Sequence, residues 1–212
     1  MEKLLKFLLW TCGLFIALCV VGRLFVFETW TVPEGGYLAA SSAPTLAGGD
    51  LVLVLTVGST KFGDLVRCPD PEKADEFVVG RIAGLGGDDV EIQGPLLRVN
   101  GTRYTASEAC LKPKFKVIHP DTGNEIEMAC SRVEMGGSWH FRGTSLKNDR
   151  SGDMKKKVGP DKVFLLSDNR SIHDDSRDFG NLDHATCQQR IFFRLWGRDG
   201  WTDSESRLTF VR

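Results

Sequence analysis

The chain has 212 residues and a formal net charge of −1, with 42% hydrophobic and 26% charged residues. This length provides one domain with a sizeable core and an additional segment. The near-neutral charge gives no electrostatic basis for a nucleic-acid partner. The 23 glycines fall in short clusters typical of turns, and we find neither an internal repeat nor a low-complexity tract.

The chain begins with an apolar segment, and residues 4–21 contain a single charge, Lys6. A helix from Leu4 to Phe27 is long enough to cross ~30 Å of hydrocarbon. Lys3 and Lys6 favour a cytoplasmic N-terminus and an exported C-terminal side. The alternative is a cleaved secretory signal. However, the small residues precede Arg23 and a further apolar stretch rather than a clean cleavage site, so we expect an uncleaved anchor.

These features predict three parts. Residues 1–3 form a short cytoplasmic N-terminus, residues 4–27 a transmembrane anchor and residues 28–212 an exported domain. We therefore expect a single-pass protein of the cell (inner) membrane whose first partner is the lipid bilayer.

Past the anchor the pattern is almost wholly β. Short apolar or alternating runs are each closed by Gly, Pro, Asn or Asp, as is typical of strands and turns. Many short strands without a long amphipathic helix predict a mainly β domain with a barrel-like or sandwich core. The more polar region at about 102–157 interrupts the series as an inserted cap subdomain would. The runs are DLVLVL, DLVRC, EFVVGRIAGL, DDVEI, LLRVN, KVFLL and RIFFRLW.

Two cysteines, Cys110 and Cys130, bracket a pair of alternating strands joined by a turn at residues 121–124. Cysteines at the two ends of a hairpin can lie opposite each other, so we expect a disulfide in an oxidising compartment. The alternative is two buried thiols. Cys12 and Cys19 fall within the membrane helix, where we expect them only to pack. The sequence contains no CxxC motif and no His/Cys cluster, so we expect no structural metal.

Residues 32–50, VPEGGYLAASSAPTLAGGD, follow the anchor. A rigid Val-Pro start, two glycines, a run of small residues and a Gly-Gly-Asp turn indicate a shaped loop of the kind that holds a nucleophile. The loop nevertheless has glycine where a nucleophile is expected.

Three stretches, in order, resemble type I signal peptidases. The first resembles the segment after the anchor, where a tight turn after Val/Ile-Pro presents the catalytic serine. The resemblance runs from about Arg23 to Gly197, with FGDLVRC and RIFFRLWG at the positions of two further strands. It implies a β-rich core with an inserted cap on a membrane anchor, and no cofactor. The stretches are RLFVFETWTVPEGGY with PTLAGGDLVLV, VVGRIAGLGGDDVEI with LLRVNG, and VFLLSDNRSIHDDSRDFG.

The resemblance implies a serine nucleophile and a lysine general base, whose pKa burial lowers until the amine accepts the hydroxyl proton. In this sequence the serine position is Gly36 and the lysine position is Gly80. The serine that helps form the oxyanion hole is replaced by Glu34, whose carboxylate would repel a developing oxyanion. The serine that supports the lysine amine falls on His173. Because catalytic groups that act as a unit fail together, these changes indicate a homologue without peptidase activity.

An active alternative remains open. Ser41 stands three residues before Pro44, as the catalytic serine does in the family, so Ser41 or Ser42 is a candidate nucleophile after an insertion in the loop. His173, followed by Asp174 and Asp175, then provides a base with a nearby carboxylate in a Ser-His-Asp arrangement. The non-catalytic interpretation is that the serines are small polar turn residues and His173 is a surface histidine.

The remaining matched residues are predicted to be scaffold. Asp–Arg pairs in a dense polar loop would fix the backbone beside the site. These residues are Arg81, Asp88, Asp168, Asn169, Arg170, Asp175, Ser176 and Arg177.

The sequence therefore predicts a membrane-anchored protein of the export pathway that binds an extended peptide, such as a preprotein segment, without cleaving it. The alternative is an active serine endopeptidase that removes signal peptides with a displaced Ser41 or Ser42 and His173. A third possibility is a structural subunit that recruits an active peptidase or another assembly partner.

Overall fold

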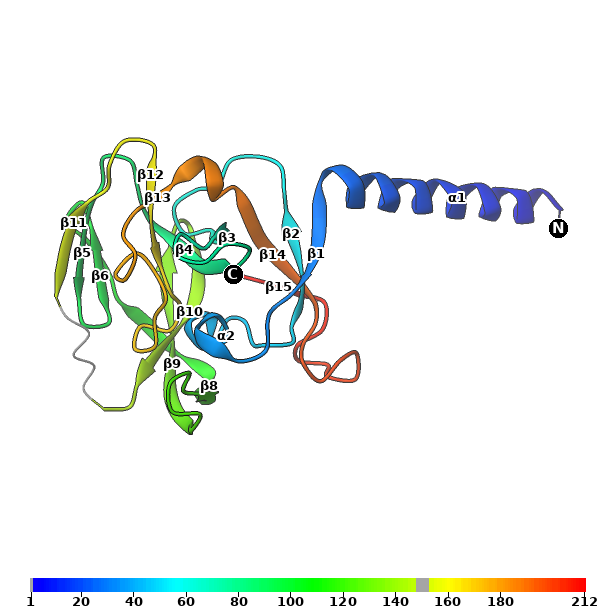
Figure 1. Ribbon diagram of the computed structural model, residues 1–212. Coiled ribbons are helices and arrows are strands. Elements are labelled where there is room, and N and C mark those ends of the chain that lie inside the picture. Colours follow the sequence, from blue (N-terminus) through cyan, green and yellow to red (C-terminus); the bar gives the residue numbers. More distant parts are fainter. Residues whose placement is uncertain (1, 148–152) are drawn as a thin grey trace.

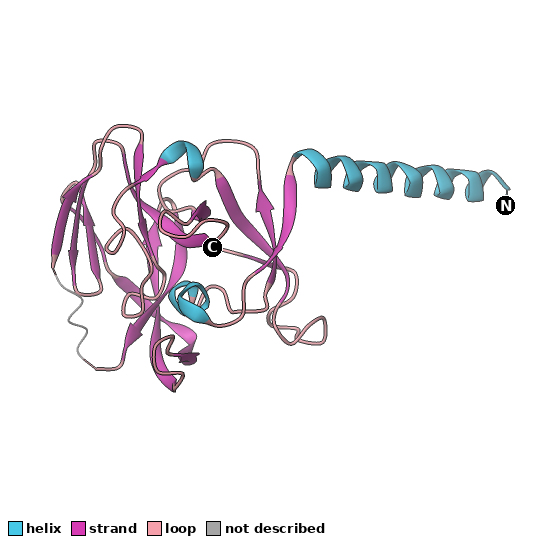
Figure 2. Cartoon of the chain, in the orientation of Figure 1, coloured by secondary structure: helices cyan, strands magenta, loops and turns pink. Residues whose placement is uncertain are grey.

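The computed structural model describes residues 2–147 and 153–212. Met1 of the predicted cytoplasmic segment and residues 148–152 of the predicted insertion lie outside this description. The described residues form one long helix, a second short helix, a 3-10 turn and fifteen strands, shown in Figures 1 and 2. Their bounds are α1 Glu2–Phe25, β1 Phe27–Thr31, α2 Gly36–Ser42, β2 Leu51–Leu55, β3 Leu65–Pro69, β4 Phe77–Leu85, β5 Asp89–Gln93, β6 Leu96–Val99, β7 Thr102–Tyr104, β8 Ala106–Ile118, β9 Glu125–Met135, β10 Ser138–Ser145, β11 Met154–Lys157, β12 Lys162–Leu166, β13 Leu182–Asp183, η1 His184–Thr186, β14 Gln189–Trp196 and β15 Thr209–Phe210.

Helix α1 projects away from the β domain as a single rod (Figure 1). Its stretch Glu2–Arg23 has the length and composition of a membrane-spanning helix, with a hydropathy of 2.3, and this fits a membrane location. The helix ends earlier than the predicted anchor, because Phe27 already pairs with Leu55 at the start of β1.

The core is a curled antiparallel sheet of eight strands. Its order is β1-β2-β14-β3-β4-β12-β13, and β15 pairs with β14. Register shifts in the β14–β2 and β12–β4 pairs bend the sheet, as β-bulges do. Strand β2 alternates between buried and half-buried residues, so its valines face the core. The predicted mainly β class is confirmed.

The predicted insertion divides between two smaller sheets. Strands β8, β9 and β10 form one sheet in the order β10-β9-β8, while β11-β5-β6-β7 form the other. Because β11 pairs with β5, the second sheet begins before residue 102. The cap is joined to the site loop through Gly143, which bridges to Asn169.

Two disulfides cross-link segments of the β domain. Cys110 and Cys130 join β8 to β9, with their Cα atoms 5.5 Å apart. Cys68 on β3 is joined to Cys187, which precedes β14, across 119 residues of sequence. The sequence did not predict this second bond, because no local pattern links cysteines so far apart.

Candidate active site

The loop after Pro33 forms the short helix α2. Two glycines with positive φ, Gly35 at +74° and Gly36 at +68°, turn the chain into the helix, and glycine adopts such angles without steric cost. At its other end, Leu46 is almost fully buried in the cluster of β2 and β3 side chains. The residues that look inserted in the sequence are therefore an ordered helical turn anchored at both ends.

Position 36, at the start of α2, is open. A Cβ built on Gly36 would meet no atom within 4 Å. Glu34 is exposed on the same loop, and its Cα lies 2.9 Å from the Cβ position of Gly48. The site therefore has space for a side chain at residue 36 but carries no hydroxyl there.

Position 80 lies in the buried middle of β4. A Cβ at Gly80 would lie 3.2 Å from the Cβ of Leu165 and 3.5 Å from the backbone of Leu166. The first distance is tighter than ordinary van der Waals contact, so Leu165 on β12 would have to shift by a few tenths of an ångström to admit a side chain at residue 80. The structure therefore places an apolar side chain against this position.

The two serines proposed as displaced nucleophiles are turned toward their own helix. Ser41 and Ser42 are each only 1% exposed, and their hydroxyls donate to the Leu38 carbonyl at 3.2 Å and 2.8 Å. Such bonds to an earlier turn are common for serine in helices. Their buried position agrees with a structural role.

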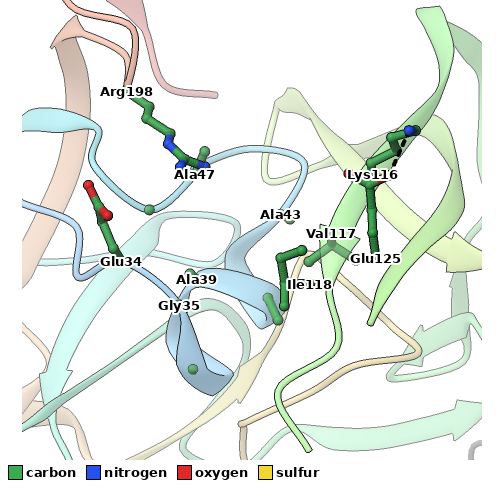
Figure 3. A pocket seen from close by; sticks show the side chains of 13 residues that line it. Glu34, Gly35, Ala39, Ala43, Ala47, Lys116, Val117, Ile118, Glu125 and Arg198 are labelled. Atoms are coloured by element: carbon green, nitrogen blue, oxygen red, sulfur yellow. Dashed lines mark hydrogen bonds and ion pairs between the residues drawn. The ribbon is translucent and has the colours of Figure 1, made fainter. Parts of the chain in front are cut away.

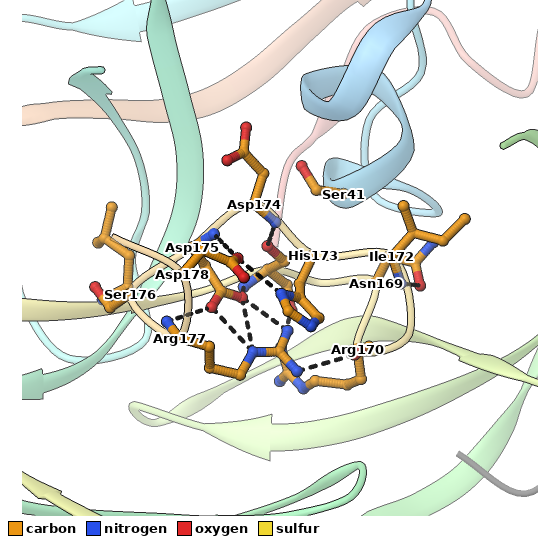
Figure 4. A network of polar contacts seen from close by, with 12 residues as sticks. Ser41, Asn169, Arg170, Ile172, His173, Asp174, Asp175, Ser176, Arg177 and Asp178 are labelled. Carbon is orange, nitrogen blue, oxygen red and sulfur yellow. Dashed lines mark hydrogen bonds and ion pairs between the residues drawn. The ribbon is translucent and has the colours of Figure 1, made fainter. Parts of the chain in front are cut away.

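His173 has a different carboxylate partner from the one predicted. Its Nδ1 lies 2.7 Å from Asp178 Oδ2, because a turn at residues 175–178 brings Asp178 back over the loop. The predicted Asp175 is also near, with a carboxylate oxygen within 4.8 Å of a His173 ring nitrogen. Among the described residues neither Ser41 nor Ser42 forms a hydrogen bond with His173, and Figure 4 marks no such contact.

Asp174, the next residue, has a raised pKa. Burial raises the pKa of Asp174 to about 6, with further contributions from Asp70 and Asp178.

Arg81 and Asp168 form a buried ion pair beside α2. Arg81 donates from Nε to Oδ1 at 2.7 Å and from Nη2 to Oδ2 at 3.0 Å. Thr45, which follows α2, donates to the same carboxylate at 2.5 Å. A bidentate pair fixes direction as well as distance. It therefore holds strand β4, the loop after α2 and the loop after β12 in one arrangement.

Asn169 caps the end of α2. Its backbone N–H donates to the Ser41 carbonyl and its side-chain amide donates to the Ala40 carbonyl, both at 2.9 Å. The last carbonyls of a helix have no partner within it, so these bonds complete a helix too short to be stable alone.

The rest of the loop is held by similar pairs (Figure 4). Arg177 binds Asp175 with two nitrogens, at 2.9 Å and 2.8 Å, and the Ser176 hydroxyl accepts the Leu165 N–H at 2.9 Å. Arg170 is fully buried, donates to the Ser167 carbonyl, and burial lowers its pKa to about 9. Asp88 lies elsewhere, accepting the Leu85 N–H in the turn between β4 and β5.

A groove of about 210 Å³ lies between α2 and the β8–β9 hairpin (Figure 3). One wall consists of Gly35, Gly36 and four alanines of the site loop, and the other of residues 116–118 with Glu125. Glu34 and Arg198 stand at the end near Gly48. The groove is therefore walled by small residues on the side that carries Gly36.

Sequence reasoning missed a contact across this groove. The Tyr37 hydroxyl on α2 donates to Asp121 at the hairpin tip, at 2.7 Å, and this bond raises the pKa of Tyr37.

Sequence reasoning also missed His140, buried on β10 with Nε2 3.9 Å from Asp168 Oδ1. Burial, with Arg81 next in effect, lowers the pKa of His140 well below its usual value. No local pattern marks either residue.

One group of described residues, His173, Asp175 and Asp178, has ligand atoms within 4.8 Å of one another, as a metal site requires. Both Asp175 oxygens already accept hydrogen bonds from Arg177. Asp178 in turn contacts His173, so the three side chains are already engaged in contacts within the protein.

Proteins of one known family are similar to this chain. The family described as "Signal peptidase, peptidase S26" matches residues 4–196. A signal peptidase I of Bacillus caldolyticus is 30% identical over 189 residues, which cover 86% of this chain and 87% of the relative. Signal peptidase IB of Staphylococcus aureus (strain Mu50 / ATCC 700699) is 28% identical over 199 residues, covering 92% of this chain and 91% of the relative.

Among solved structures, a signal peptidase I of Enterococcus faecalis V583 matches 62% of this chain and 95% of its own, with 21% identity and a TM-score of 0.40. The match to the family extends over most of the chain, from the apolar helix through the site loops to the end of β14. The chain belongs to the signal peptidase family, peptidase S26.

Proposed function

We propose that this protein is a membrane-anchored signal peptidase homologue that holds an extended peptide in the groove beside α2 without cleaving it. The observation that carries the proposal is the pairing of an intact groove with glycine at positions 36 and 80. Glycine supplies neither a nucleophile nor a proton acceptor.

The surroundings of the two glycines support the loss of chemistry. Leu165 packs against position 80, so a relocated amine has no prepared space there. Glu34 brings a carboxylate to the groove, where it would oppose charge developing on a carbonyl oxygen. Ser41 and Ser42 are buried and directed at Leu38, so neither hydroxyl is presented to a peptide in the groove.

The peptide is proposed to be a segment of an exported preprotein, because the relatives are signal peptidases. Helix α1 would lie in the membrane with Lys3 and Lys6 on the cytoplasmic side. Strand β1 joins α1 to the site loop, so the groove would lie on the far side of the membrane, where exported segments emerge.

Binding in this groove can be tested with the full-length protein in detergent and a fluorescent peptide carrying a small-residue signal cleavage site. Ala47 is exposed and lines the groove, so Ala47→Trp should fill it and abolish binding. Ala74 is equally exposed but lies in the turn before β4, so Ala74→Trp should bind like the wild type. Equal binding by all three proteins would contradict the proposal.

A further inference from the structure

One side of the groove is formed by β8, whose second edge pairs with no other strand among the described residues. β8 is the outer strand of the β10-β9-β8 sheet, and its residues 116–118 line the groove opposite α2 (Figure 3). An outer strand presents a row of N–H and C=O groups without strand partners. The groove therefore offers main-chain hydrogen bonds as well as a surface.

The hairpin register decides which backbone groups point into the groove. The His119 N–H donates to the Asn124 carbonyl at 2.9 Å, and the same register continues through Val117↔Ile126 and Phe115↔Met128. In an antiparallel pair, hydrogen-bonded residues alternate with residues whose backbone groups point away. Because His119, Val117 and Phe115 bond toward β9, the N–H and C=O groups of Lys116 and Ile118 face outward.

The free edge is short. On the side of Lys114, the β8–β9 register breaks between Ala109 and Lys114. At the other end the hairpin turns after Ile118. A strand rises about 3.4 Å per residue, so Lys116 to Ile118 extends over roughly 7 Å, enough to pair two or three residues of a peptide.

The charges along the edge favour a peptide rather than a second copy of the sheet. Lys114 pairs with Glu127 at 2.8 Å and Lys116 with Glu125 at 2.6 Å. Lysine on an outer strand discourages sheet-to-sheet association. A single extended peptide fits between this edge and the small residues of α2.

From this geometry we infer that the bound peptide is held by β-strand addition to β8, through the outward backbone groups of Lys116 and Ile118. The occupant is an extended segment without proline at its pairing positions. This inference rests on the proposed function and names the contact that would hold the peptide.

Proline substitution removes one outward N–H at a time. Lys116→Pro should weaken binding of the fluorescent peptide by about three- to tenfold, the effect expected for a lost hydrogen bond. Lys114→Pro is the matched control, because Lys114 shares the outward parity and an ion pair with β9 but does not line the groove.

A second measurement does not depend on the folding of a variant. Peptides N-methylated at one position each should lose binding to the wild-type protein at alternate positions only, since every second N–H faces the edge. Uniform tolerance of N-methylation, or equal effects of Lys116→Pro and Lys114→Pro, would overturn strand addition while peptide binding itself stood. Absence of any peptide binding by the wild-type protein would overturn both the inference and the proposed function.

Discussion

At the scale of single residues, the two glycines predicted to take the positions of the family's serine and lysine have opposite environments. Gly36 has open space around its Cβ position, whereas Gly80 is enclosed by β12. The match of these two residues to the family's serine and lysine positions is a prediction from sequence alone. The closed packing at Gly80 could not be predicted in this way, because Leu165 is brought there only by the pairing of β12 with β4.

Placing serine at residue 36 and lysine at residue 80 should therefore lower the stability of the protein by unequal amounts. Gly80→Lys should lower the free energy of unfolding by about 1–3 kcal/mol from overpacking, before any cost of burying an ammonium. Gly36→Ser should cost about 1–2 kcal/mol, because its φ of +68° disfavours a side chain. Thermal unfolding of each full-length variant in the same detergent measures the difference. A Gly80→Lys protein that unfolds no earlier than Gly36→Ser would show that β12 does not close over residue 80.

Asp174 makes the stability of the loop depend on pH. Its pKa in the folded protein is raised to about 6, mainly by burial, above the roughly 3.9 of a free aspartate. The folded state thus binds the proton more tightly, and this stabilisation is complete below about pH 3.9 and lost as the pH rises through about 6. Asp174→Asn should gain stability relative to the wild type across that interval, by no more than about 1 kcal/mol because the side chain is partly exposed.

The measurement for Asp174 is the difference in melting temperature between the variant and the wild type at pH 4 and pH 7. The difference should be more favourable to the variant at pH 7. Asp178→Asn is unsuitable as a control because Asp178 contacts His173. Asp161→Asn serves instead, since Asp161 is exposed in the turn before β12 and should show no such trend. A difference that does not change with pH would contradict the raised pKa.

At the scale of elements, the hairpin and α2 form the two sides of the groove, and they differ in how far sequence could predict them. Alternating residues and an Asp-Thr-Gly-Asn turn indicate the β8–β9 hairpin directly. Helix α2 has only seven residues, and an isolated helix of that length is not stable in water. It depends on Asn169, far away in sequence, so a reading of residues 32–50 alone gives a loop.

The hydrogen bond between Tyr37 and Asp121 should limit opening of the groove. Tyr37→Phe and Asp121→Ala should each speed hydrogen exchange of the hairpin-tip amides by about a few-fold, because each removes this solvent-exposed hydrogen bond. The double variant should exchange no faster than either single one. Tyr104→Phe is the matched control, because its ring packs on Phe62 and lies outside the groove. Additive effects of the two changes would mean that the residues act separately.

At the scale of the whole molecule, the apolar helix and the β class were readable from composition and alternation. The order of the eight-stranded sheet was not, because β14, near the end of the chain, inserts between β2 and β3. Such pairings depend on contacts between distant segments and leave no local pattern. The same applies to the Cys68–Cys187 bond, which ties β3 to the segment before β14, and to the Arg81–Asp168 pair, which ties β4 to the loop after β12.

The central claim is that the groove binds a preprotein segment but lacks the groups that would cut it. The most direct measurement combines purified full-length protein in liposomes with a labelled preprotein, followed over time for cleavage and for retention on the liposomes. We expect retention without cleavage, because positions 36 and 80 provide no hydroxyl and no amine. Cleavage that disappears in Ser41→Ala or Ser42→Ala, and also in His173→Ala, would contradict the account and establish the displaced serine and histidine as the reacting pair.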